Sequence, residues 1–378
     1  MRYIDGFRNP AAAAAIRSRI EVLAARLDVP PGEGSRRVNV MEVCGSHTMA
    51  IARYGIRHVL PHNVELISGP GCPVCVTPTS YIDVAIALAK QGAIVVSFGD
   101  MILVPGSAST LAECRAQGGS VEICYTPLRA IELAEAHPGR EVVFLAIGFE
   151  TTIAPVVSII EQASQRNLRN VSLLTAFKLV PPALEALLAD PEIHIDAFLC
   201  PAHVSAIIGA DAYRPFAERY RVPCVVAGFE PLDILYGLQG ILEQIQRGEA
   251  QVVNQYTRVV TAGGNLRAQE LMAKYLEPVD AAWRGIGVIP ASGLGLRPEY
   301  ASYDAARRYG VKVELGRENP ACSCGDVLKG KIRPPQCRLF GKACVPDHPV
   351  GPCMVSAEGT CSAYFKAGYP FDASTPNR

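Results

Sequence analysis

Short apolar runs alternate with helical patterns along most of the chain. Seven runs of four to six residues are almost continuously apolar, which is typical of strands buried on both faces of a parallel sheet. These runs cover residues 38–43, 64–68, 94–98, 142–147, 172–175, 197–200 and 222–227. Apolar residues recur at helical spacing in segments 11–28, 81–90, 128–136, 182–189 and 232–247. This alternation of strands and helices predicts α/β structure with parallel sheets.

The alternation weakens after Gly248, and the composition changes again from Asn319 onward, where Cys, Pro and Gly accumulate. A chain of 378 residues is long enough for about two or three domains. We therefore expect α/β domains followed by a C-terminal region whose shape is set by a metal centre.

Charge and hydropathy exclude several classes of protein. Lys+Arg and Asp+Glu both number 36, so no whole-chain charge draws the protein to nucleic acid or to an anionic membrane, and we expect neither as a partner. No run approaches 18 apolar residues, and the N-terminal apolar run 11–16 is shorter than that of a secretory signal. We expect a cytoplasmic protein, in which the thirteen cysteines are metal ligands or redox groups before they are structural disulfides.

The cysteines are unevenly distributed. Four are scattered, and three lie in two short motifs near the N-terminus, namely Cys44, Cys72 and Cys75. Six more fall in the last 57 residues: Cys322, Cys324, Cys337, Cys344, Cys353 and Cys361. This distribution is the main functional signal of the sequence.

The first motif, EVCGSHTMAI, places Cys44 at the end of a predicted strand and directly before a glycine. We expect its thiol to be exposed there. His47, three residues on, is expected either to lower the pKa of Cys44 or to act as a second ligand. The alternative is a packed thiol beside an unrelated histidine.

The second motif, SGPGCPVCVTP, holds a C-x-x-C pair, Cys72 and Cys75, in a loop rich in Gly and Pro. We expect a helix to follow it, with Thr77 as N-cap and Pro78 as first residue. The helix dipole is expected to favour the thiolates of the pair. This arrangement suits a dithiol redox pair or a two-thiolate half-site for a soft metal, with Cys44 available to complete a trio.

The C-terminal cysteines are spaced too irregularly and too widely for a zinc ribbon. Four of the six are expected to ligate an iron–sulfur cluster, which leaves two thiols as a neighbouring redox pair. We assign the cluster to Cys337, Cys344, Cys353 and Cys361, which six, eight and seven residues separate. Cys322 and Cys324 then serve as redox thiols or alternative ligands. The competing interpretation is a structural zinc site with two free thiols.

Three other polar residues follow predicted strands. His203, in PAHVS, is a candidate base or ligand, with a structural role as the equal alternative. Glu150 and Glu230 occur in Gly-Phe-Glu turns, where we favour helix capping over ligand binding. The Gly-rich segments 262–265 and 291–296 lack the fingerprints of nucleotide sites.

Taken in order, these motifs resemble the HypD family of hydrogenase maturation proteins. The family's motifs correspond to EVCGSHTMAI, SGPGCPVCVTP, AIGFETTIAP, CPAHVS, AGFEPLDIL and the tail that begins CSCGDVLKGK, and the resemblance covers about residues 5 to 370. Ser46 departs from the family, in which that position carries Thr or Gly.

The resemblance implies two Rossmann-like α/β domains with parallel sheets and a C-terminal Cys-rich iron–sulfur domain. The expected boundaries are 1–125, with the Cys44 and Cys72/Cys75 motifs, 126–247, and 248–378 with the cluster.

The resemblance also implies maturation of nickel–iron hydrogenases, by an assembly scaffold with redox activity rather than by a conventional enzyme. Cys44, Cys72 and Cys75 correspond to the cysteines that hold iron carrying cyanide and CO ligands, and the tail corresponds to the region that binds a 4Fe–4S cluster. The implied partners are a HypC-type chaperone, HypE as cyanide donor with HypF, and indirectly the hydrogenase large subunit. The alternatives are an iron–sulfur-dependent thiol–disulfide oxidoreductase and a zinc-stabilised interaction protein.

Overall fold

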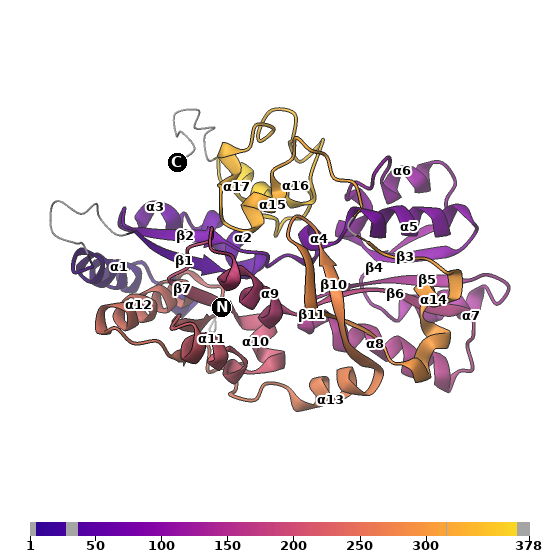
Figure 1. Ribbon diagram of the computed structural model, residues 1–378, viewed down its shortest axis with the longest axis horizontal. Coiled ribbons are helices and arrows are strands. Elements are labelled where there is room, and N and C mark those ends of the chain that lie inside the picture. The colour runs from indigo at the N-terminus through magenta and orange to yellow at the C-terminus, as the bar shows by residue number, and fades with distance from the viewer. Residues whose placement is uncertain (1–4, 28–36, 315, 369–378) are drawn as a thin grey trace.

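The computed structural model describes residues 5–27, 37–314 and 316–368, which form two β-sheets, their covering helices and a Cys-rich tail (Figure 1). The first sheet has five parallel strands. Their order is β2 (Val64–Ser68), β1 (Val38–Glu42), β7 (Ala197–Pro201), β8 (Cys224–Ala227) and β9 (Val252–Asn254).

The second sheet has six strands, four of them parallel. Their order is β10 (Leu276–Trp283), β11 (Gly287–Leu296), β6 (Val171–Lys178), β5 (Val142–Gly148), β3 (Ile94–Phe98) and β4 (Val121–Cys124). Strands β10 and β11 form an antiparallel hairpin that joins β6 at the edge. The predicted α/β class with mostly parallel sheets is therefore confirmed.

All seven predicted strands are present, and the five predicted helices are α1 (Pro10–Ala25), α5 (Thr79–Lys90), α7 (Arg129–Ala136), α9 (Val180–Ala189) and α12 (Pro231–Arg247). Four strands were not predicted, among them both strands of the β10–β11 hairpin. Several residues of each hairpin strand are exposed, so neither strand has the continuous apolar run of a buried strand.

The other helices are mostly short. The α-helices are α2 (Gly45–Arg53), α3 (Ile56–Val59), α4 (Pro73–Val76), α6 (Leu111–Ala116), α8 (Glu150–Gln165), α10 (Ala202–Ile208), α11 (Arg214–Arg219), α13 (Leu266–Tyr275), α14 (Ala305–Tyr309), α15 (Cys324–Leu328), α16 (Pro352–Val355) and α17 (Thr360–Lys366). Short 3₁₀ helices are η1 (Asp5–Arg8), η2 (Gly99–Leu103), η3 (Ala210–Tyr213), η4 (Pro298–Tyr303) and η5 (Pro334–Gln336). None of the described helices is long and apolar enough to cross a membrane.

The chain passes between the two sheets more than once. It forms β1 and β2 of the first sheet, then β3 to β6 of the second, and returns for β7 to β9 before the hairpin joins the second sheet. Each sheet therefore contains strands from both of the predicted segments 1–125 and 126–247. These segments remain a prediction as domain boundaries. This path brings the motifs after β1, β2, β7 and β8 to the carboxyl edge of one sheet, where open α/β sheets bind ligands.

The tail packs on the region between the two sheets, above the hairpin in Figure 1. The largest apolar core joins residues of both sheets to buried tail cysteines, including Cys353 and Cys361. Trp283, at the end of β10, is fully buried in this core and donates a hydrogen bond from its indole N–H to Ser292 Oγ. The C-terminal cysteines are therefore part of the protein's interior rather than a surface appendage.

Candidate thiol site

Cys44 lies where β1 passes into α2 and occupies the N-cap position of that helix. Backbone N–H groups of Ser46 and His47 point at its thiol, as expected at a helix N-terminus. The side chain is buried, however, which corrects the expectation of an exposed thiol. Burial, followed by the nearby charge of Glu358, raises the pKa of Cys44 to about 12. A nearby cation is therefore needed to hold Cys44 as a thiolate at neutral pH.

The C-x-x-C loop sits directly against Cys44. The backbone N–H of Gly45 donates to the carbonyl oxygen of Gly71, at 3.0 Å. A Cβ atom on Gly71 would lie only 2.3 Å from the backbone nitrogen of Cys44, so this close approach requires glycine. The two sequence motifs, separated along the chain, thus form one local structure.

The ring of His47 points away from Cys44, toward the end of β8. Its Nε2 lies 3.1 Å from the carbonyl oxygen of Ala227 and 2.9 Å from that of Gly228. Burial lowers the pKa of His47 to about 4, so the ring is neutral at physiological pH. The expected effect on the pKa of Cys44 comes from the backbone N–H of His47 and not from its imidazole, while its role as a ligand stays a prediction.

A second histidine, His203, contacts the same aromatic ring, Phe229, as His47 does. The ring of Phe229 contacts both imidazoles in tilted geometry, with ring centroids 4.7 Å from His47 and 4.2 Å from His203. His203 is largely exposed, although partial desolvation lowers its pKa. His203 also feels the charge of Glu358, which acts on Cys44 as well.

Glu358 is a site residue that the sequence reasoning missed. Ser46 Oγ donates a hydrogen bond to Glu358 Oε1 at 2.5 Å, and the carboxylate acts electrostatically on both Cys44 and His203. A Cβ atom on Gly45 would lie 2.4 Å from the Cβ of Glu358, so the tail closes tightly over the start of α2. The available signal was that Glu358 is the sole acidic residue between Pro352 and Gly368.

The two glutamates of the Gly-Phe-Glu turns have structural contacts. Glu230 caps α12 with a reciprocal capping box to Asp233, which confirms the favoured interpretation. Glu150 begins α8, and its Oε1 accepts a hydrogen bond from the backbone N–H of Val180, the first residue of α9. Burial raises the pKa of Glu150 to about 7.

The C-x-x-C pair is not in an open loop. Cys72 is the N-cap of the short helix α4, which contains Cys75, and α5 begins at Thr79 with Pro78 as its N-cap instead of Thr77. Burial raises the pKa of Cys75 well above its ordinary value, and contacts with Cys353 and Cys72 raise it further. For Cys75 the expected stabilisation of a thiolate by the helix dipole is therefore outweighed by burial.

Thiols from the two ends of the chain meet at Cys353. Its sulfur lies near those of Cys324, Cys361 and Cys75, and interactions with these thiols lower the pKa of Cys353 well below its ordinary value. Cys324 in turn lies against Cys322, with 3.2 Å between the two Sγ atoms. A continuous series of buried thiols thus runs from the C-x-x-C pair to the C-x-C pair of the tail.

A small apolar cavity next to this series is lined by five cysteines: Cys322, Cys324, Cys337, Cys344 and Cys361. Its volume is about 10 Å³, so the thiols largely fill it themselves. A Cβ atom on Gly351 would lie 2.4 Å from Cys324 Sγ and 2.6 Å from Cys322 Sγ, so this glycine lets the backbone pass over the pair.

Three of the four predicted cluster ligands line the cavity, and the fourth, Cys353, lies outside the set of lining residues. Cysteine thiolates are the ligands of iron–sulfur clusters, so the donor set fits, provided that the side chains rotate outward to make room. Among the described residues, no group of three His, Cys, Asp or Glu side chains is already arranged to hold a metal ion.

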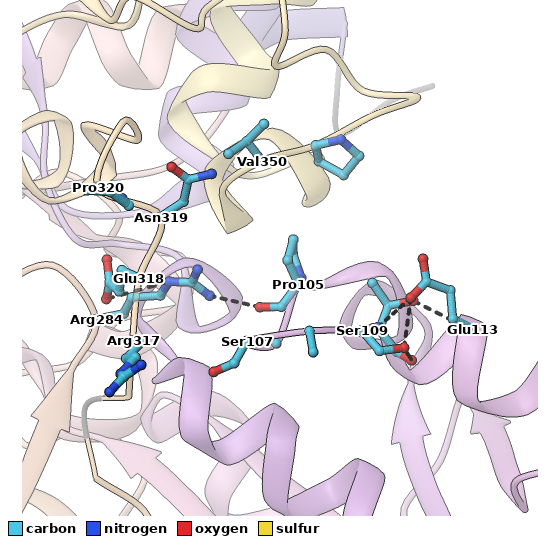
Figure 2. Close-up of a pocket in the computed structure, with 14 residues that line it drawn as sticks. Pro105, Ser107, Ser109, Glu113, Arg284, Arg317, Glu318, Asn319, Pro320 and Val350 are labelled. Atoms are coloured by element: carbon cyan, nitrogen blue, oxygen red, sulfur yellow. Dashed lines mark hydrogen bonds and ion pairs between the residues drawn. The ribbon is translucent and has the colours of Figure 1, made fainter.

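A larger polar cleft of about 590 Å³ lies on the outer side of the cavity, between the loop 105–110 and the segments 317–320 and 349–350 (Figure 2). Its wall includes Arg284, which is almost fully buried and donates from Nη1 to the carbonyl oxygen of Pro105 at 3.4 Å. Val350 also lines the cleft, and its backbone N–H donates to Cys344 Sγ at 3.3 Å. The cleft therefore reaches the solvent side of the cysteine cavity.

The fold and the site together define a cysteine-rich α/β protein whose interior thiols suit soft-metal binding or thiol redox chemistry. A family model described as "HypD: Hydrogenase formation hypA family" matches residues 15–368, and the chain belongs to this family.

Curated relatives match over almost their whole length. A hydrogenase maturation factor HypD from Azotobacter vinelandii is 46% identical over 376 residues, which are 97% of each chain. The HypD proteins of Rhizobium leguminosarum bv. viciae and Escherichia coli K12 are 43% and 41% identical, each over 97% of this chain and over 96% and 98% of their own. The resemblance seen in the sequence motifs is thus confirmed.

Proposed function

We propose that this protein acts in the maturation of nickel–iron hydrogenases, as a scaffold on which iron receives its cyanide and CO ligands. The observation that carries the proposal is the convergence of Cys44, the C-x-x-C pair and the tail cysteines in one buried thiol site. The names of the curated relatives support the hydrogenase pathway. We further propose that it works in the cytoplasm, where thiols stay reduced.

In this proposal iron is the cargo, and Cys44, Cys72 and Cys75 are its thiolate ligands. Cyanide and CO favour low-spin ferrous iron, and thiolates are soft donors that suit it. Binding the cation offsets the burial that raises the pKa values of Cys44 and Cys75, so the thiols release their protons as the metal binds. The amide groups at the start of α2 further stabilise a thiolate at Cys44.

We assign the 4Fe–4S cluster to the cysteine cavity of the tail. Cys337, Cys344 and Cys361 belong to both the sequence-based set and the cavity. For the fourth ligand we favour Cys322 over Cys353, because Cys322 lines the cavity and Cys353 does not. Cys353 and Cys324 interact with each other and remain available as a thiol pair. When bound, the cluster supplies single electrons.

The remaining thiols are proposed to form a two-electron relay between the cavity and the iron site. Oxidation of a dithiol to a disulfide releases two electrons and two protons. A cyano group carried on a partner's cysteine as a thiocyanate takes up two electrons, breaks its S–C bond and leaves as cyanide, with a thiolate as the other product. Cys324 and Cys353, which in this proposal ligate neither the iron nor the cluster, form the proposed dithiol, and the cluster returns the two electrons to their disulfide one at a time from an external reductant.

The partners that we propose are a HypC-type chaperone and HypE, which HypF supplies with the cyano group, with the hydrogenase large subunit as the final recipient. A scaffold for a labile cargo needs a donor and an acceptor, which the chain's own residues do not provide. A second candidate function is an iron–sulfur-dependent thiol–disulfide oxidoreductase, which the interactions of three thiols with Cys353 favour.

Infrared spectroscopy of the anaerobically purified complex with the HypC-type chaperone tests the scaffold. Bands in the triple-bond region are expected from metal-bound cyanide and CO, and they are expected to be lost in the Cys44→Ala complex. A complex with iron and redox-active thiols but no such bands would support the oxidoreductase instead. Zinc in place of iron would contradict both.

A further inference from the structure

Helices α2 and α17 pack against each other (Figure 1). A groove is lined by residues of both helices. Its volume is about 570 Å³. Cys44 caps the N-terminus of α2, and Cys361 lies in the first turn of α17. The two helices that line the groove therefore also position Cys44, from the N-terminal motifs, and Cys361, from the tail.

Both helices present the same pattern to the groove. Helix α2 contributes Met49, Ala52 and Arg53, and α17 contributes Ala363, Lys366 and Ala367, so each supplies residues at positions i, i+3 and i+4. Such residues lie on one face of a helix. Four of the lining residues are alanines, and such small side chains allow another backbone to come close.

The lining of the groove is more apolar than polar, and the groove is open to solvent. Met49, which lines the groove, is 39% exposed, and methionine adapts well to a partner's shape. The dimensions and the two helical walls favour an amphipathic helix as the occupant.

The charge of the rim indicates which kind of helix fits. Arg53, His58 and Lys366 line the groove, and no acidic side chain is among the described residues that line it. The chain as a whole is neutral, so this excess of basic groups is local. Complementary charge selects partners and speeds their association, so acidic residues are expected beside the apolar stripe of the incoming helix.

We propose that the groove between α2 and α17 docks an amphipathic, acidic-flanked helix of a partner protein. This proposal goes beyond the scaffold function, since it depends on neither the iron nor the cluster. A helix seated there contacts the elements that carry Cys44 and Cys361 without blocking either thiol. A helix in the groove also covers Met49, which the chain otherwise leaves partly exposed.

A charge-swap binding experiment with the full chain tests the proposal. The probe is a fluorescein-labelled 16-residue helical peptide with leucines at i, i+3, i+4 and i+7 and glutamates on both flanks, and the control peptide carries lysines in place of the glutamates. Fluorescence anisotropy at low salt is expected to give at least tenfold tighter binding of the glutamate peptide. The double variant Arg53→Glu/Lys366→Glu is expected to reverse this preference.

Matched variants separate the groove from general charge effects. Lys90→Glu/Arg115→Glu changes the net charge equally at exposed positions on α5 and α6, and is expected to leave the preference intact. Ala52→Trp and Ala367→Trp fill the groove and are expected to weaken binding at least tenfold, with circular dichroism confirming the fold. Equal binding of both peptides, or an unchanged preference in the double variant, overturns the proposal. Binding that occurs only after deletion of residues 369–378 also overturns it, because the chain's own end is then the occupant.

Discussion

The thiol of Cys75 lies near the thiol of Cys353 and interacts with it, although the two residues come from opposite ends of the chain. The contact joins α4, at the carboxyl edge of the first sheet, to α16 in the tail. Cys75 Sγ also approaches the carbonyl oxygen of Pro352, at 3.9 Å. Because both cysteines are fully buried, they exchange protons or electrons with each other more readily than with solvent.

This contact predicts the consequence of interrupting the thiol series. Cys75→Ser and Cys72→Ser are each expected to impair hydrogenase maturation while the iron–sulfur chromophore remains, because neither residue lines the cavity to which we assign the cluster. Hydrogenase activity in a complemented deletion strain and visible absorption of the anaerobically purified protein provide the two measurements. Cys124→Ser, at the end of β4 and distant from the site in sequence, is the control. Loss of the chromophore in either variant would assign the C-x-x-C pair to the cluster instead.

The contact between Glu358 and the start of α2 predicts a change in the reactivity of Cys44. Burial is the main cause of the raised pKa of Cys44, and the negative charge of Glu358 is the second. Glu358→Gln removes this charge, which disfavours the thiolate, and keeps the size of the side chain. We expect the pKa of Cys44 to fall and its alkylation by iodoacetamide at pH 9 to become several-fold faster in metal-free protein. Mass spectrometry of the Cys44 peptide gives the rate.

Glu299→Gln, which changes an exposed carboxylate on η4, serves as the control for that measurement. An alkylation rate in Glu358→Gln equal to that of the unmodified chain would show that the carboxylate does not act on Cys44.

The burial of Lys178 predicts that the free energy of unfolding of the protein depends on pH. Lys178 is 3% exposed at the end of β6, near the ring of Trp283, and burial lowers its pKa from 10.5 to about 8. Between pH 8 and pH 10.5 the unfolded chain binds more protons than the folded one, so this group makes the folded state more stable as the pH rises. Below pH 8 the cost of burying the ammonium is fully present, at most about 3 kcal/mol.

Lys178→Met is therefore expected to raise the free energy of unfolding at pH 7 by about 1–3 kcal/mol, and this gain is expected to shrink by about half at pH 9.5. Urea denaturation at the two pH values measures it. Lys90→Met, at an exposed position on α5, is expected to show no such dependence on pH. A pH-independent effect of Lys178→Met would mean that the ammonium has a compensating partner.

The contrast between Cys44 and the predicted strands shows what the sequence determines. Val64–Ser68 and Ile94–Phe98 form strands with the predicted bounds, because an apolar run of that length has few other ways to be buried. The prediction that Cys44 is exposed was wrong. Glu358, which lies over the start of α2 and accepts a hydrogen bond from Ser46, is 312 residues further along the chain than Ser46. No local pattern contains that contact.

The same limit applies to the orientation of His47 and to the cysteines of the tail. The ring of His47 is held by the carbonyl oxygens of Ala227 and Gly228, which only the pairing of β7 with β8 brings to α2. Spacing along the tail suggested Cys353 as a ligand and gave no reason to connect it with Cys75. The family was recognisable because its motifs are long, whereas the contacts between motifs follow from the fold.

The lining of the cysteine cavity leads to a prediction about the cluster. Cys322, Cys337, Cys344 and Cys361 are among the cysteines that line it, whereas Cys353 does not line it. Single substitution of any of those four cavity cysteines by alanine is expected to remove the cluster or most of it, because a cubane needs one thiolate for each iron. Cys353→Ala is expected to retain the cluster.

Iron content and visible absorption after anaerobic purification decide the assignment, and Cys124→Ala controls for the loss of a buried thiol elsewhere. Cys324 is the discriminating position, because it lines the cavity and also contacts Cys353 and Cys322. We expect Cys324→Ala to keep its iron and to lose maturation activity, as a relay thiol would. A full cluster in Cys322→Ala together with an empty Cys353→Ala protein would restore the set that the spacing alone suggested.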